Sequence, residues 1–111
     1  MTLVSEIRMT TVKPSGAVSA ENVNEFEKQL NSAVSFQNNS ILLVDMGKVD
    51  FLDSAGLMAL VNSFSLAQSL GRRFIICSLA PSVKMIFELT QLDRVFEIFE
   101  SRDTIESNLV N

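Results

Sequence analysis

The sequence contains no histidine and a single cysteine, Cys77. These two scarcities exclude a Ser-His-Asp triad, a Cys-His pair and a zinc site built from His and Cys ligands. Only four glycines are present and they are dispersed, so the chain also lacks a glycine-rich loop that could cradle nucleotide phosphates. Most familiar hydrolase mechanisms are therefore excluded, and neither enzymatic activity nor a bound cofactor or metal is expected.

The chain also lacks a basic cluster and a long apolar run. It has 9 Lys and Arg against 13 Asp and Glu, a net charge of -4, with no basic stripe of the kind that phosphate backbones require. No window approaches the ~18 apolar residues typical of a membrane span, and the start has no basic segment followed by an apolar stretch. We therefore expect a cytoplasmic protein whose partners are neither nucleic acid nor membrane. Cys77, in an apolar run, should be a buried, reduced thiol.

Short runs of apolar and β-branched residues predict the strands. Ile41-Leu42-Leu43-Val44 and Phe74-Ile75-Ile76-Cys77 are wholly apolar, which is typical of central strands covered on both faces. With a helix between them, they should form one parallel crossover unit. The sequence Pro14-Ser15-Gly16 predicts a turn. Further strands are predicted at 3–13 (one or two edge strands), 49–52 and 95–99.

Apolar residues at helical spacing predict helices at about 20–36 and 54–70. Pro81 opens a third helix, because proline is preferred in a first turn whose amide needs no partner. Ser101 or Asp103 is expected to cap a fourth helix that holds Ile105, Leu109 and Val110. The predicted inner face of the second helix consists of Leu57, Leu60, Val61, Phe64, Ala67 and Leu70.

The most informative segment runs from Val49 to Leu57. It delivers Asp53 and Ser54 to the first turn of a helix, where unpaired backbone amides and the positive end of the dipole favour a phosphate group. Gly56, without a side chain, would let a partner or a phosphate oxygen approach the backbone closely. The local pattern alone favours a simple helix cap at Asp53 or Ser54, with Gly56 only relieving crowding against a neighbouring loop, because Asp and Ser are common before helices.

From Ile41 onward the chain resembles the STAS domain family, specifically the bacterial anti-sigma-factor antagonists. The residues that carry the resemblance lie at 43–46, 49–57, 71–74 and 78–83, with order and spacing kept through 96–99. The resemblance implies an α/β fold with a mixed four- or five-stranded sheet and about four helices. We expect this single STAS domain to span residues 1–111.

In that family, the serine that follows the aspartate is phosphorylated by an anti-sigma factor that is a serine kinase, and a serine phosphatase of the PP2C type reverses the modification. The resemblance implies that Ser54 is the acceptor and Asp53 its fixed neighbour. The unphosphorylated form would bind the kinase and so release a sigma factor. Two departures are visible: Ala55 replaces a usual second hydroxyl residue, and Ser19 stands where an acidic residue often follows the first glycine.

A partner surface is expected around Ser54. Met58, Asn62 and Leu66, spaced by four, form a stripe beside the buried face of the second predicted helix, with Met58 closest to the serine. The same stripe also fits an edge of the core. The predicted partner-binding residues are Ser19, Asp53, Ala55, Gly56, Met58 and Asn62, in a protein that is a monomer or a weak dimer.

Three other functions fit parts of the sequence. A stand-alone STAS subunit of a transporter or signalling scaffold would keep the fold without acting on a sigma factor. A receiver domain phosphorylated on Asp45 would need an acidic pair after its first strand, where this chain has Lys13 and Pro14. A small enzyme using Ser54 with Lys48 as base lacks an orienting third group.

Overall fold

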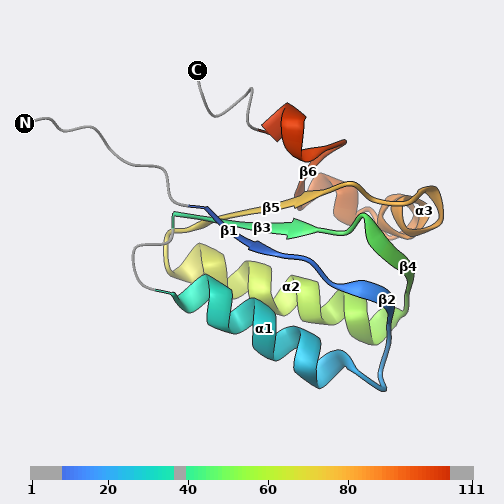
Figure 1. The fold of residues 1–111 in the computed structure, drawn as a ribbon, viewed down its shortest axis with the longest axis horizontal. Coiled ribbons are helices and arrows are strands. Elements are labelled where there is room, and N and C mark those ends of the chain that lie inside the picture. The colour runs from blue at the N-terminus through green and yellow to red at the C-terminus, as the bar shows by residue number, and fades with distance from the viewer. Residues whose placement is uncertain (1–8, 37–39, 106–111) are drawn as a thin grey trace, which may run out of the picture.

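The structure is a computed structural model that describes residues 9–36 and 40–105. Its main sheet has the strand order β1-β3-β5-β6, and β2 pairs with β4 in a second, two-stranded sheet (Figure 1). Every strand pair within the described residues is parallel. No antiparallel pair of the kind expected in a mixed sheet occurs among these residues. The strands are β1 (Met9–Val12), β2 (Ser15–Val18), β3 (Ile41–Asp45), β4 (Lys48–Leu52), β5 (Arg73–Cys77) and β6 (Glu97–Phe99).

Two long helices, α1 (Val23–Ser35) and α2 (Ser54–Ser69), lie side by side against the main sheet (Figure 1). They are followed by α3 (Pro81–Leu89) and the short 3-10 helix η1 (Leu92–Arg94). Residues 102–105 are helical, and the Ser101 hydroxyl accepts a hydrogen bond from the Thr104 amide at 3.3 Å, as expected of its cap. Leu109 and Val110, predicted for this helix, lie outside the described residues.

The central strands are buried on both faces, as their unbroken apolar runs predict. Alternate side chains of β3 and β5, such as Leu42 and Ile76, join the large core under α1 and α2. Those between them point to the opposite face and form a smaller cluster: Ile41, Leu43, Ile75, Cys77 and Ile105. Cys77 is fully buried, and desolvation raises the pKa of its thiol, which keeps it protonated and unreactive.

Two local predictions are wrong. Pro14-Ser15-Gly16 does not turn the chain, because Ser15 and Gly16 pair with β4; Gly16, at φ +75°, accommodates an irregularity in the register. Leu70 is 45% exposed instead of facing the core, because the helix ends at Ser69 and Gly71, at φ +69°, turns the chain. Ala59 and Ser63 are buried on α2 although the predicted inner face did not include them.

Candidate functional site: an exposed serine at the start of α2

Ser54 is exposed and is the first residue of α2, which only Asp53 separates from the end of strand β4. The helix begins here because Asp53 caps it: its backbone is extended, and its Oδ1 accepts a hydrogen bond from the Gly56 amide at 3.0 Å. The serine hydroxyl is therefore presented to solvent on a fixed turn. The predicted presentation of Ser54 at a helix start is confirmed, whereas its modification stays a prediction.

Asp53 uses its second carboxylate oxygen to hold a distant loop. Oδ2 accepts a hydrogen bond from the Ala20 amide at 3.1 Å, and the Asp53 amide donates to the Val18 carbonyl at 3.2 Å. The hydrogen bond from Gly56, with further backbone amides including Ala20, holds the pKa of Asp53 below its usual value. Both carboxylate oxygens are thus engaged within the chain, which makes Asp53 a positioning residue in this structure.

The loop at 19–22, between β2 and α1, lies next to the Ser54 turn at one end of the molecule (Figure 1). The predicted contact residue Ser19 is half-buried in this loop. Asn22 holds the loop: its Oδ1 accepts from the Ser19 amide at 2.9 Å and its Nδ2 donates to the Ala17 carbonyl at 2.8 Å. The sequence prediction missed Asn22, although an asparagine just before a helix is a familiar sign of side-chain to backbone bonding.

Gly56 is buried, and its missing side chain serves packing. A Cβ atom there would lie 2.6 Å from Leu52 Cδ1, 2.9 Å from Val18 Cγ1 and 2.9 Å from the Val18 carbonyl oxygen. This contact supports the alternative in which Gly56 relieves crowding against a neighbouring loop. The absence of a Cβ atom also lets the first turn of α2 pack directly against the end of β2, so the glycine supports the site by packing beneath it.

The stripe predicted along α2 runs from exposed residues near Ser54 to the edge of the core. Met58 is 53% exposed, Asn62 is exposed and its amide donates to Glu27 of α1 at 3.3 Å, and Leu66 packs partly against the core. The sequence prediction missed Phe51, which is 52% exposed on β4 three residues before Ser54. An aromatic residue in a strand is usually read as core, so its exposure could not be inferred from the pattern.

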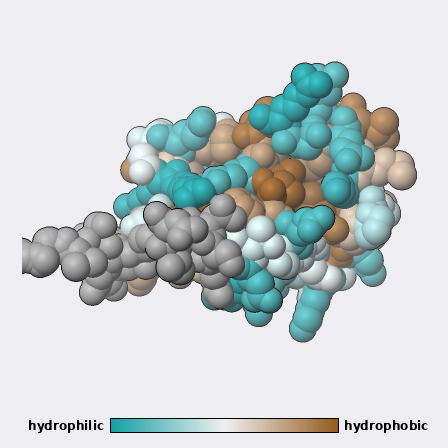
Figure 2. Space-filling model, turned by 90° about the horizontal axis from the view of Figure 1, so that it is seen from above, coloured by the Kyte–Doolittle hydropathy of each residue, from teal (hydrophilic) through white to brown (hydrophobic). Residues whose placement is uncertain are grey.

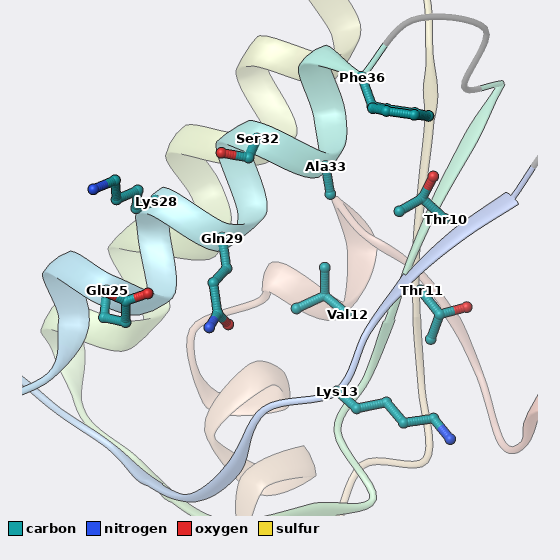
Figure 3. A pocket seen from close by; sticks show the side chains of 10 residues that line it. All are labelled: Thr10, Thr11, Val12, Lys13, Glu25, Lys28, Gln29, Ser32, Ala33 and Phe36. Atoms are coloured by element: carbon teal, nitrogen blue, oxygen red, sulfur yellow. The ribbon is translucent and has the colours of Figure 1, made fainter.

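Other surface features lie outside this site. A groove of about 660 Å³ separates β1 from α1, with Val12, Ala33 and Phe36 as apolar lining and Lys13 and Lys28 at its rim (Figure 3). On the side of the molecule seen in Figure 2, apolar residues are surrounded by hydrophilic ones. Within the part of the chain that the structure describes, no cluster of three or more potential metal ligands occurs, and no helix is long and apolar enough to cross a membrane.

Asp45, the acceptor in the receiver-domain alternative, instead closes the turn between β3 and β4. Its Oδ1 accepts a hydrogen bond from the Gly47 amide at 3.0 Å.

The fold and the site together define a small α/β domain that presents a serine at a helix start. The STAS domain model matches residues 2–105, and the chain belongs to this family.

Relatives in this family share much of the chain. A Bordetella bronchiseptica protein assigned as an anti-sigma factor antagonist, BtrV, is 26% identical over 88 residues, which cover 79% of this chain and 75% of BtrV. A crystal structure of a Thermotoga maritima protein with the same assignment superposes with a TM-score of 0.84 at 21% identity, covering 96% of this chain and 92% of that one. The match to the Thermotoga maritima structure, at this identity, shows a shared fold.

The fold is also that of the anti-sigma factor antagonist SpoIIAA, for which structures of both modification states are known. The unphosphorylated form matches with a TM-score of 0.69 at 12% identity, over 98% of this chain and 94% of that one. The phosphorylated Bacillus protein matches with a TM-score of 0.71 at 12% identity, over 98% and 96%. The same architecture therefore exists with and without phosphate in a protein of this fold.

Proposed function

We propose that this protein is an anti-sigma-factor antagonist: a non-enzymatic binding protein that is switched by phosphorylation of Ser54. The observation that carries the proposal is an exposed serine at the first position of α2, fixed by the Asp53 cap. Membership of the STAS family and the assignment of BtrV support it. Unmodified, the protein binds an anti-sigma factor that is a serine kinase, and the sigma factor is released.

The chemistry at Ser54 needs only a hydroxyl from this chain. The kinase supplies ATP, magnesium and a base; Ser54 Oγ bonds to the γ-phosphorus, the bond to the β-phosphate oxygen breaks, and the base accepts the hydroxyl proton. A PP2C-type serine phosphatase later hydrolyses the phosphoester and restores the hydroxyl. Switching therefore depends on access to Ser54, which its exposure provides.

Phosphate at Ser54 blocks the interface by charge and bulk. The modification adds about 1.5 to 2 negative charges at neutral pH, next to the carboxylate of Asp53 and near the exposed Asp50. The exposed apolar side chains of Met58, one helical turn after Ser54, and Phe51, three residues before it, then share the surface with an anion instead of a neutral hydroxyl. A partner that covers these side chains must desolvate that anion, which costs free energy unless it supplies a cation.

An affinity capture tests this function. The baits are wild type, Ser54→Ala, Ser54→Asp and the matched control Ser65→Asp, whose exposed position on α2 places the same charge away from the first turn. We expect a serine kinase to be retained by wild type, Ser54→Ala and Ser65→Asp and to be lost with Ser54→Asp. Equal retention by Ser54→Asp would refute the switch, and capture of a transport protein in place of a kinase would favour the transporter-subunit alternative.

A further inference from the structure

Asn22 precedes α1 but does not cap it. Asparagine in this position usually accepts a hydrogen bond from the first turn of its own helix. Here no side-chain cap bond is made, and the carboxamide joins the loop to β2: its Oδ1 accepts from the Ser19 amide at 2.9 Å and its Nδ2 donates to the Ala17 carbonyl of β2 at 2.8 Å. The side chain therefore holds residues 17–19 in place of stabilising α1.

The loop held by Asn22 is also the loop held by Asp53. The backbone amides of Ser19 and Ala20 donate to different side chains. Ser19 donates to Asn22 Oδ1, and Ala20 donates to Asp53 Oδ2 at 3.1 Å. Asp53 in turn donates its amide to the Val18 carbonyl. Since Ser54 follows Asp53 directly, these hydrogen bonds hold the loop beside the serine, whose own position is set by α2 and its Asp53 cap.

Side-chain packing holds this loop only in part. A hollow of about 230 Å³ borders it, lined by Val18 and Asn22 together with residues of α1 and of the segment after β1. Val18 is buried, but residues 20–22 are exposed. The side chains of Asn22 and Asp53 thus add to the order supplied by the backbone bond from the Asn22 amide to the Ser19 carbonyl at 3.0 Å, and losing one of them leaves the loop more room to move.

We propose that Asn22 is a positioning residue for the Ser54 site, because it holds the loop at 19–22 in the orientation that the kinase binds together with the serine. The proposal rests on the function proposed above for the identity of the partner. Ser54 itself stays on α2 when Asn22 is removed, so the loss falls on binding. The expected effect is a raised KM for phosphorylation with kcat nearly unchanged.

The test compares wild type with Asn22→Ala and with the matched control Asn24→Ala, an exposed residue in the first turn of α1. Amide hydrogen exchange is measured by NMR, and steady-state phosphorylation is measured with the purified kinase retained by the Ser54→Ala bait. In Asn22→Ala we expect exchange at Ser19 and Ala20 to rise about tenfold and KM about five- to tenfold. The unfolding midpoint should move by less than about 4 °C.

The two measurements separate failure of this inference from failure of the proposed function. Unchanged exchange at Ser19 and Ala20 in Asn22→Ala overturns the positioning role whether or not a kinase is found. Faster exchange with a wild-type KM also overturns it, because a loosened loop would then leave binding of the kinase unchanged. An equal rise of KM in Asn24→Ala would assign the effect to the start of α1. Absence of any kinase on the Ser54→Ala bait counts against the proposed function, while the exchange data still decide the geometry.

Discussion

Single side chains position the Ser54 site. Asp53 divides its two carboxylate oxygens between the Gly56 amide and the Ala20 amide, so one residue both starts α2 and attaches a loop more than thirty positions earlier in the chain. These are hydrogen bonds to the charged form of the carboxylate, which is why its pKa lies below the usual value. The residue next to the proposed acceptor thus fixes the geometry of the site.

Replacing Asp53 by Ala should lower stability in a pH-dependent way. A carboxylate with a depressed folded pKa stabilises the fold above its unfolded pKa, and this stabilisation is lost as pH falls through the folded value. We expect the unfolding midpoint of Asp53→Ala to lie below that of wild type at neutral pH, with the gap closing as pH drops below the ordinary value of 3.8. Thermal unfolding between pH 2 and pH 7 measures it, and a gap independent of pH would show that the charge is irrelevant.

For single residues, the sequence pattern correctly predicted that Asp53 and Ser54 lie at the start of a helix, because a strand end followed by a capped helix is a local arrangement. It did not predict Asn22 or the exposure of Phe51. The partners of Asn22 are backbone groups whose direction depends on how β2 pairs with β4, and the exposure of Phe51 depends on what covers β4. Both are properties of the assembled fold.

Among the elements, α2 is packed tightly at its first turn. Its buried residues include Gly56 in the first turn, where the helix touches Leu52 and Val18. The helix also bonds to α1 inside the structure, since the Ser63 hydroxyl donates to Asn31 Oδ1 at 2.8 Å and Ser63 is fully buried. A buried serine paired in this way costs little, whereas an unpaired one would be expensive. The start of α2 is therefore held rigidly from inside the fold.

Gly56→Ala should destabilise the fold, although alanine normally favours a helix. The added Cβ lies within 2.9 Å of the Val18 carbonyl oxygen, and a backbone atom cannot rotate away. We expect the free energy of unfolding to fall by about 1–3 kcal/mol, as is usual for overpacked cores. Urea unfolding measures it, with Ser65→Ala on the exposed side of α2 as control, expected to change by less than about 0.5 kcal/mol. A stabilised Gly56→Ala would show that the turn has space to spare.

The sequence predicted most elements because their signals are local: apolar runs for β3 and β5, helical spacing for α1 and α2, and Pro81 for α3. The prediction of a turn at Pro14-Ser15-Gly16 was wrong because residues usual in turns can also form a bulged strand when a partner strand is available. That partner, β4, lies more than thirty residues further on. Pairing at this distance leaves no mark in a short window of sequence.

For the molecule as a whole, phosphorylation should change binding without unfolding. A helix start favours an anion, and a phosphorylated protein of this fold exists. With phosphoserine incorporated at position 54 during translation, we expect the unfolding midpoint to stay within about 4 °C of the unmodified protein. Calorimetry measures the midpoint, and pull-down of the kinase should be lost in the same sample. A modified protein that melts at room temperature would instead mean that phosphate acts by disrupting the domain.

Within the described residues, the two sides of the main sheet are covered unequally. Two long helices shield one side, but on the other the thiol of Cys77 lies in a small cluster that includes Ile105 of the helical turn at 102–105. Ile105 of this turn packs in the cluster around the thiol, so weakening its packing should raise the reactivity of Cys77 before it unfolds the domain. Ile105→Ala is expected to let a thiol reagent such as DTNB label Cys77 under native conditions, while the wild-type protein reacts only after denaturation.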